Sequence, residues 1–355
     1  MKHFLIYTNC RKDKGMVMTG RIRSYLESRG NKCTVILRNK EDGSHHKAEE
    51  IGESNIAAGE TLYPTDAYCM IVLGGDGTML QAAWDVRKTN IPLIGVNLGT
   101  LGYMTEVEPG GLEEALDQLM AGTVVSESRM MLNGKVYGRE GKVTEDWSLN
   151  DIVISRSGAL QVIKMNIYVN GQFLKDYSAD GVIVTTPTGS TGYNLSAGGP
   201  IAEPSSRLII MTPICPHTLS SRSIILSPED VIDIEIPEGR EGRTQQVTAN
   251  FDGAHEVPMC TGDRIRIVKS EKTTEILSLH RASFLEVLHR KMRENDNAGD
   301  KGVSLVCSEY KKGWPETATY IPLPAYDAPT GTLRNVDPAI IGALSKRIAE
   351  IIGQD

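Results

Sequence analysis

The sequence predicts a two-domain protein, with an α/β N-terminal domain built on a parallel sheet and a β-rich C-terminal domain. Up to about residue 123, apolar runs of strand length alternate with segments whose apolar residues recur at helical spacing. Beyond that point, short apolar runs are separated by Gly, Pro, Asn and Asp, and helical periodicity is scarce. A chain of 355 residues is long enough for two domains that each bury a sizeable core.

The N-terminal domain, residues 1–123, is predicted to be Rossmann-like because its strand and helix patterns follow one another in turn. An approximate helical stripe lies between the first two strand patterns, and Leu112–Met120 predicts a short amphipathic helix that closes the domain. The predicted strands are Phe4–Thr8, Thr34–Leu37, Cys69–Leu73 and Ile91–Val96. Helical crossovers between successive strands favour a parallel sheet.

A glycine-rich turn, Gly74-Gly75-Asp76-Gly77-Thr78, follows the third predicted strand and opens a helix-like segment. The first amides of a helix lack internal partners and bind phosphate, and glycines let a polyphosphate approach the backbone. The turn therefore predicts phosphate contacts at Gly74, Gly75, Gly77 and Thr78. Asp76 could accept a proton from a hydroxyl nucleophile or help to hold a metal ion; the alternative is that it only caps the helix.

A second glycine turn, Asn97–Gly102, leaves the carboxyl end of the next predicted strand. Ligands bind at the carboxyl ends of strands in open parallel sheets. We therefore expect the two turns to form one phosphate-binding crevice, to which Gly99 and Gly102 contribute.

The C-terminal part is divided by the same patterns into a β-rich domain at 124–270, a strand and helix at 271–293, and an extension at 294–355. Asn170-Gly171 predicts a hairpin turn, and Ser283 with Glu286 predicts a capping box at the start of a helix. The extension ends in a helical pattern, Asp337–Ile352, whose aliphatic residues share one face. The role of the extension is not predicted.

The segment Asp180–Pro200 carries a strand pattern followed by a loop dense in Thr, Ser and Gly. So many hydrogen-bonding groups after an apolar strand favour a nucleotide ligand over an ordinary polar loop. The sequence contains neither a P-loop nor a G-x-G-x-x-G dinucleotide fingerprint, and no nucleophile elbow surrounds Ser190.

Composition excludes several classes of protein. The formal net charge of −7 argues against a general nucleic-acid binder, and no run approaches the 18 apolar residues of a membrane span. The 6 cysteines lack CxxC spacing and the 7 histidines form no cluster of ligands, which favours reduced thiols and a cytoplasmic location. His45-His46 lies in a polar segment and predicts a solvated loop.

Taken together, these motifs resemble those of the NAD kinases. The resemblance covers about residues 1–293 and rests on both glycine turns, Asp180–Pro200, and two further segments, Leu149-Asn150-Asp151 and Pro213–Arg222, with a weaker match at Asp252-Gly253. It implies an NAD kinase-like two-domain architecture with NAD bound between the domains, and it implies that the strand and helix at 271–293 return to the first domain. The activity it implies is phosphorylation by ATP and Mg²⁺ of the 2′-hydroxyl of the adenosine ribose of NAD, giving NADP.

The same resemblance implies roles for individual residues. Asp76 corresponds to the proton acceptor of the family. The adenosine half of NAD would contact Asn150, Thr188, Thr191 and Tyr193, and the ribose or nicotinamide half would contact Asp151 and Asp180. The full set of implied NAD-binding residues is Asp76, Gly77, Asn150, Asp151, Asp180, Thr188, Thr191, Gly192, Tyr193, Asn194, Leu195 and Ser196. No protein ligand for the metal is predicted, since Mg²⁺ would arrive with ATP, and a homodimer or homotetramer is implied.

Two features depart from the family pattern: Asp151 stands where the family has a glutamate, and the extension after residue 293 has no counterpart. Two rival functions remain open. A non-catalytic NAD(P) sensor would have no need of Asp76, and a lipid or sugar kinase would share only the first glycine turn. His217 is a rival base to Asp76, although a role in shaping its loop is preferred. The sequence leaves open whether NADH or polyphosphate is used.

Overall fold

The chain forms two compact units, Met1–Met292 and Arg293–Asp355. The computed structural model describes residues 1–38, 45–48, 63–64, 66–99, 102–158, 162–218, 221–279, 283–293, 326–327 and 332–333. Within the second unit, β18 (Tyr326–Asp327) pairs antiparallel with β19 (Thr332–Leu333). The helix predicted at Asp337–Ile352 lies outside the described residues.

Parallel strands form the N-terminal part of the first unit, in the order β5-β4-β1-β2. Their bounds are β1 His3–Asn9, β2 Lys32–Arg38, β4 Ala67–Gly74 and β5 Leu93–Asn97. These strands are nearly continuous apolar runs because helices cover both faces of the sheet.

One more strand, β3 (His45–Ala48), pairs antiparallel with the edge strand β2. The prediction of a solvated loop at His45-His46 was wrong for the backbone. The unpaired N–H and C=O groups of an edge strand accept a partner of almost any sequence, so the polar composition did not decide the structure.

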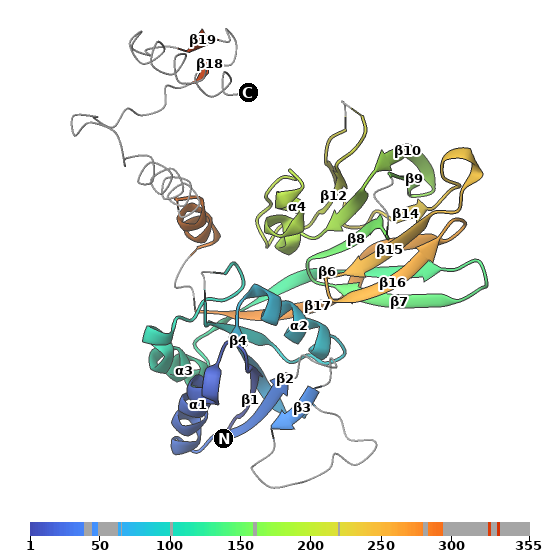
Figure 1. The fold of residues 1–355 in the computed structure, drawn as a ribbon. Helices are drawn as coiled ribbons and strands as arrows, with labels where there is room; N and C mark the ends of the chain where they lie inside the picture. The colour runs from blue at the N-terminus through green and yellow to red at the C-terminus, as the bar shows by residue number, and fades with distance from the viewer. Residues whose placement is uncertain are drawn as a thin grey trace, which may run out of the picture. The chain divides into compact units, whose positions relative to one another are not determined.

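Three helices cover the two faces of this parallel sheet, as Figure 1 shows. On one face, α1 (Val17–Ser28) buries Ile22 and Leu26, and α3 (Leu112–Ala121) buries Leu116 and Leu119. On the other face, α2 (Asp76–Val86) packs through residues such as Met79. The helices begin where the apolar spacing predicts, and short 3-10 turns precede two of them at Lys14–Met16 and Pro109–Gly111.

The C-terminal part is β-rich, as predicted. One sheet has the strand order β13-β12-β11-β8-β15-β16, and it shares a core with the strands β6, β9, β10, β14 and β17. The bounds are β6 Val125–Tyr137, β7 Val143–Ser148, β8 Asp151–Arg156, β9 Ile163–Val169, β10 Gln172–Ala179, β11 Gly181–Thr185, β12 Ile209–Ile214, β13 Ile224–Leu226, β14 Ile232–Glu235, β15 Gln246–Phe251, β16 His255–Cys260 and β17 Arg264–Ser278. Short helical turns lie at Thr188–Thr191, Tyr193–Ser196 (α4) and Arg240–Gly242.

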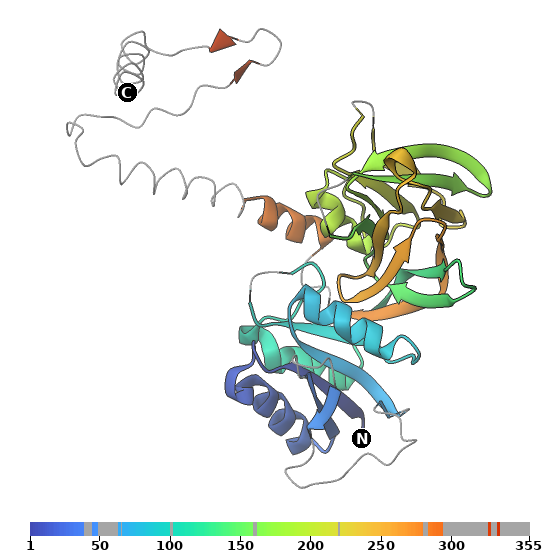
Figure 2. The ribbon, with the colours of Figure 1, turned by 45° about the vertical axis from the view of Figure 1, so that its right-hand side comes forward.

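The long strand β17 joins the two parts of the unit. It pairs antiparallel with β6 in both halves, its first half also pairs antiparallel with β14, and near its end Ile276 pairs parallel with Leu93 of β5. The register shifts between Lys269 and Thr273, where the strand passes from one part to the other. An eleven-stranded sheet therefore runs through both parts, and β17 crosses between them in Figures 1 and 2.

Two local predictions are confirmed by the hydrogen bonds and backbone angles. Asn170 and Gly171 have φ of 52° and 76°, as a tight hairpin turn between β9 and β10 requires. The helix at 284–293 starts with a capping box, in which the Ser283 amide donates to Glu286 Oε2 at 2.7 Å and the Glu286 amide donates to Ser283 Oγ at 3.2 Å. None of the described helices has the length and apolar character of a membrane span.

Candidate active site

The first glycine turn links the end of β4 to the start of α2. Gly75 is the residue before the helix, and its carbonyl accepts the amides of Thr78 at 2.8 Å and Met79 at 3.1 Å. A Cβ atom on Gly74 would lie 2.2 Å from Thr78 Oγ1, so only glycine fits there. The turn thus presents the free amides at the start of a helix, as a phosphate site requires.

Asp76 connects this turn to the second one. Its Oδ2 accepts the Tyr103 amide and its Oδ1 accepts the Met104 amide, each at 2.9 Å. A Cβ atom on Gly102 would lie 2.2 Å from Asp76 Oδ1, so Gly102 leaves room for the carboxylate. Asp76 is the first residue of α2, and the bonds to Tyr103 and Met104 hold its two oxygens on residues outside that helix. The alternative in which it is only a helix cap is therefore wrong.

The two glycine turns lie side by side, as predicted. Strands β4 and β5 pair in parallel with Gly74 opposite Asn97, and the Leu98 amide donates to the Gly74 carbonyl at 2.9 Å. The Asn97 side chain shapes the second turn, since its Oδ1 accepts the Gly99 amide at 3.0 Å. Amides from both turns therefore meet at the carboxyl edge of the sheet.

A second aspartate, Asp252, shapes the turn between β7 and β8. Its carboxylate accepts the amides of Leu149, Asn150 and Asp151 at 2.7, 2.8 and 3.0 Å. Asp252 lies in the turn from β15 to β16 and has a positive φ of 51°. The sequence offered only the dipeptide Asp252-Gly253 as a weak signal, and nothing in it indicated this contact over a separation of 101 residues or more.

Asp151 is buried beside this carboxylate, with 6% of its surface exposed. Burial, together with the charge of Asp252, raises the pKa of Asp151 to about 7. Burial also raises the pKa of Asp252 to about 6, although its three amide donors act in the opposite direction. Because those donors favour the charged form of Asp252, a proton taken up by the pair binds to Asp151.

The Thr/Ser/Gly loop is attached to the same β7–β8 turn. Thr185 Oγ1 donates to the Asn150 carbonyl at 2.9 Å, and Thr186 Oγ1 donates to the Leu149 carbonyl at 2.6 Å. A Cβ atom on Gly189 would lie 2.4 Å from the Asn150 carbonyl oxygen. The glycines of the loop therefore serve its close packing against the turn.

The polar atoms buried at this junction without a hydrogen-bond partner in the described part of the chain include Asn150 Oδ1 and Thr188 Oγ1. Buried polar groups are nearly always hydrogen-bonded, and an unmatched group costs about 1–3 kcal/mol. A ligand with donor and acceptor groups would satisfy both atoms. Both residues belong to the set implied to contact the adenosine half of NAD.

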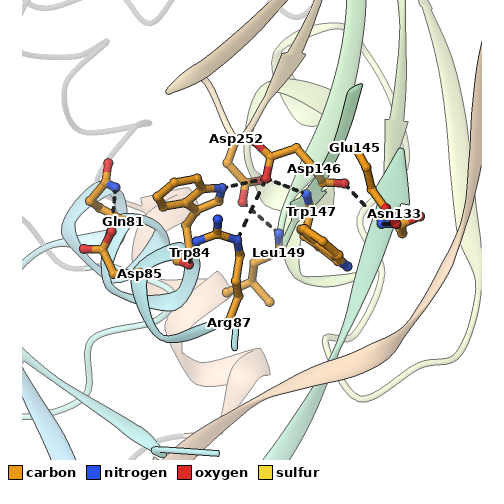
Figure 3. Close-up of polar contacts among 10 residues, drawn as sticks. All are labelled: Gln81, Trp84, Asp85, Arg87, Asn133, Glu145, Asp146, Trp147, Leu149 and Asp252. Carbon is orange, nitrogen blue, oxygen red and sulfur yellow. Dashed lines mark hydrogen bonds and ion pairs between the residues drawn. The ribbon is translucent and has the colours of Figure 1, made fainter. Parts of the chain in front are cut away.

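A cluster of aromatic and charged side chains joins α2 to this turn (Figure 3). Trp84 Nε1 donates to Asp146 Oδ1 at 2.8 Å, and the same oxygen accepts the Trp147 amide at 2.9 Å. The Trp84 ring stacks on His255 at a centroid distance of 3.7 Å, and the Arg87 guanidinium lies 3.5 Å from the Trp84 ring centroid. The helix that carries Asp76 is thus attached both to β7 and to the β15–β16 turn.

Family comparisons agree with this architecture. The N-terminal domain of the ATP-NAD kinases matches residues 4–124, and their C-terminal domain matches residues 149–279. The chain belongs to the ATP-NAD kinase family. Among its relatives, the NAD kinase of Agathobacter rectalis is 44% identical over 292 residues, which make up 82% of this chain and 99% of that protein. The NAD kinase of Lachnospira eligens is 42% identical over 301 residues, covering 82% of this chain and 100% of that protein.

Solved structures of ATP-NAD kinases have the same fold. The yeast NADH kinase in complex with NADH superposes with a TM-score of 0.66 and 25% identity, covering 81% of this chain and 86% of that one. An NAD kinase from Archaeoglobus fulgidus in complex with ATP gives a TM-score of 0.61 and 22% identity, covering 79% and 95%. The predicted two-domain fold and the resemblance to this family are confirmed.

The structure brings most of the residues implied by the ATP-NAD kinase motifs into two groups. One group contains Asp76 with the two glycine turns, and the other contains Asn150, Asp151, Thr188 and Gly192, where a Cβ atom on Gly192 would lie 3.4 Å from Asn150 Nδ2. The second group borders Asp252.

The remaining loop residues implied by the family resemblance lie outside these two groups. Asn194 is fully buried and its side chain is used within the protein, donating to the carbonyls of Ser190 and Pro200 and accepting from Thr212 Oγ1. Tyr193 is 47% exposed and Leu195 is 40% exposed at the surface of the loop. Thr191 and Ser196 lie on the same loop, in the short helical turns.

Asp180 is separated from the Asn150 group. It pairs with Arg156 at 3.3 Å, at the start of β11, whereas Thr185 ends that strand opposite Asp151. A strand rises about 3.3 Å per residue, so roughly 17 Å of strand separates the two ends. His217 lies at the same end as Asp180, where its amide donates to the Ser178 carbonyl at 2.8 Å.

Proposed function

We propose that the crevice between the two glycine turns and the β7–β8 turn is the catalytic centre, with Asp76 as the proton acceptor and ATP as the phosphoryl donor. As a member of the ATP-NAD kinase family, the protein is a transferase that phosphorylates NAD to NADP. The observation that carries the assignment of the centre is the carboxylate of Asp76, which both glycine turns surround.

The geometry supports this role for Asp76 in two ways. Each oxygen accepts one backbone amide, so the carboxylate has a fixed orientation. A carboxylate has about four lone-pair sites, so two remain for a hydroxyl proton. The amides of the turns face the place where phosphate oxygens would bind, which supports transfer by positioning and charge neutralisation.

The acceptor side of the reaction is assigned to the β7–β8 turn and the Thr/Ser/Gly loop. The buried Asn150 Oδ1 would accept a hydrogen bond from the adenosine half of NAD, and the buried Thr188 Oγ1 would donate one to it. Asp151 borders the same place and would bind a ribose hydroxyl. Its side chain is one methylene shorter than the glutamate of the family pattern, so we expect a water-bridged contact.

Mg²⁺ is proposed to enter as part of the MgATP substrate, bound by phosphate oxygens. Among the described residues, no group of three His, Cys, Asp or Glu side chains is arranged to hold a metal ion. When bound, the ion would neutralise charge on the polyphosphate. A homo-oligomer and a cytoplasmic location are also proposed, from the family resemblance and from the cysteine pattern.

The replacement Asp76→Asn tests this assignment because it keeps the shape of the side chain and removes the proton acceptor. We expect the turnover number to fall by about 10²–10⁴, with the dissociation constant for NAD nearly unchanged. Activity would be measured by mixing protein, MgATP and NAD and detecting NADP with an NADP-specific dehydrogenase. Near-normal turnover would refute the role of Asp76. Binding of NAD by the wild type without any NADP formation would instead favour the sensor function.

A further inference from the structure

The turn between β1 and α1 lies against the first glycine turn. Its residues follow Asn9, whose carbonyl accepts the amides of Lys12 and Asp13, both at 2.9 Å. The Asn9 side chain reaches the glycine turn itself, since its Nδ2 donates to Thr78 Oγ1 at 3.4 Å. The two backbone bonds fix the turn to Asn9, and the side-chain bond fixes Asn9 to the start of α2.

Asp13, the aspartate of this turn, binds the start of α1. The Asp13 carboxylate is buried and accepts the Met18 amide at 3.0 Å, the Thr19 amide at 2.8 Å and the Thr19 hydroxyl at 2.7 Å. It thus satisfies the first free amides of α1. No hydrogen bond or ion pair connects it to its neighbour Lys12 in the described part of the chain.

The ammonium of Lys12 lies directly over the glycine turn. A Cβ atom on Gly75 would be only 2.9 Å from Lys12 Nζ, so the absence of a side chain at Gly75 lets the ammonium approach the backbone. Across the described residues, this ammonium has no carboxylate partner and no hydrogen bond. A cation with no anionic partner, beside the free amides at the start of an eleven-residue helix, is suited to an anion.

Lys12 also borders a cavity of about 720 Å³ that reaches the second glycine turn. The wall of the cavity includes Asn97, Leu98 and Gly99 from that turn and Val17 and Met18 from α1. Its charged residues besides Lys12 are Asp13, Lys14 and Glu108. The cavity therefore lies on the face of the sheet that α1 covers. The β7–β8 turn lies on the other face, because Leu149 belongs to the core that contains Met79 of α2.

We propose that Lys12 binds the polyphosphate of ATP at the first glycine turn and neutralises charge on it during transfer. The proposal rests on the catalytic centre proposed above and assigns the donor to the α1 side of Asp76 and the acceptor to the other side. In the reaction, the ribose 2′-oxygen forms a bond to the γ-phosphorus and its proton passes to Asp76. The bond from the γ-phosphorus to the β–γ bridging oxygen breaks, and its electron pair leaves with ADP.

The first test replaces Lys12 by methionine, which keeps the length of the side chain and removes its charge. Loss of a charge-assisted contact predicts a roughly 10- to 100-fold higher KM for ATP, with the KM for NAD within about twofold of the wild type. Binding of a non-hydrolysable ATP analogue with Mg²⁺, measured by calorimetry, should weaken by the same factor. Lys12→Arg should recover part of the loss. Arg11→Met removes one charge from an exposed residue of the same turn that does not line the cavity, and it serves as the matched control.

The outcomes separate the proposal from the function on which it rests. A higher KM for NAD with an unchanged KM for ATP would place Lys12 on the acceptor side and overturn the proposal. So would equal effects of the Lys12 and Arg11 variants, which would indicate only a general loss of charge. If the wild type formed no NADP, the proposed centre would fail, and the calorimetric comparison would still decide whether Lys12 binds the donor.

Gly75→Ala gives a second, independent test. Gly75 has φ of −141° and ψ of −170°, a conformation that alanine adopts, so the variant should fold. Its methyl group would displace the Lys12 ammonium and should raise the KM for ATP in the same way as Lys12→Met. In the double variant the two effects should not add. Full additivity would show that Gly75→Ala acts independently of the Lys12 ammonium. The position of the ammonium over Gly75 would then not matter for ATP binding, and the proposal would be overturned.

Discussion

Replacing Asp151 by asparagine is expected to stabilise the ligand-free protein at and above neutral pH. The carboxyl group of Asp151 is almost fully buried and lies beside Asp252, which raises its pKa to about 7. Above that pH the folded protein must hold two carboxylates close together in a site largely removed from water. Asparagine has nearly the same shape and carries no charge at any of these pH values.

The sign and size of the effect follow from proton linkage. An aspartate in the unfolded chain has a pKa of about 3.9, so between about pH 4 and pH 7 the folded state of Asp151 binds more protons than the unfolded state. The free energy of unfolding contributed by this group is therefore highest at low pH, falls as the pH rises through this window and levels off above about pH 7. A difference of about 3 pKa units corresponds to at most about 4 kcal/mol.

Urea unfolding of both proteins at pH 4.5 to 8, without nucleotide, measures this difference. The stability of Asp151→Asn relative to the wild type should increase across the window and then remain constant. Asp176→Asn, which changes an exposed carboxylate on β10, should show no such trend. The reasoning is refuted if the asparagine variant is the less stable protein at pH 8, or if the difference between the two proteins does not depend on pH.

Further replacements test the other contacts of the site. Gly102→Ala would place a methyl group 2.2 Å from Asp76 Oδ1 and should lower kcat on the order of 10²-fold by displacing the carboxylate, whereas Gly110→Ala meets no atom within 4 Å and should leave kcat unchanged. Unchanged kcat in Gly102→Ala would show that the carboxylate need not be fixed in place. Trp84→Leu should lower the free energy of unfolding by roughly 1–3 kcal/mol and lower kcat more than it changes either KM, because it detaches α2 from Asp146 and His255. A variant that loses stability alone would show that the cluster serves folding only. Asp151→Ala should raise the KM for NAD several-fold and leave that for ATP nearly unchanged, and a reversal of that pattern in steady-state kinetics would place Asp151 on the donor side.

The parts of the fold that depend on local pattern could be predicted from the sequence. The strand before Gly74 is a continuous apolar run, and the helix after Asp76 has helical apolar spacing, so both elements were predicted near their observed bounds. The meeting of the two glycine turns also followed, because both leave the carboxyl ends of strands that are neighbours in a parallel sheet.

The contacts that join distant segments could not be predicted in the same way. Asp252 accepts the amide of Asp151 across 101 residues, and an Asp-Gly dipeptide reads locally as no more than a turn. Strand β17 continues through the polar residues 269–275, so local pattern did not predict one strand there. Nor did it reveal that β14 pairs with the first half of β17 and β5 with its end, while β6 pairs with both halves. Lys12 was missed because an exposed lysine in a turn has no local signal, and its position depends on the contacts of Asn9 and Asp13.

Asp76 and Asp252 both accept loop amides, and they differ in how many lone pairs those amides occupy. The oxygens of Asp76 accept one amide each, and the side chain is partly exposed in the crevice. Asp252 accepts three amides, with both Asn150 and Asp151 donating to Oδ1. Asp76 therefore keeps lone pairs on both oxygens, as the proposed proton acceptor requires, whereas Asp252 binds the backbone of the β7–β8 turn with both oxygens. An amide at residue 252 would turn an NH₂ group toward one set of those backbone donors, so the β7–β8 turn requires an acid at this position for its shape.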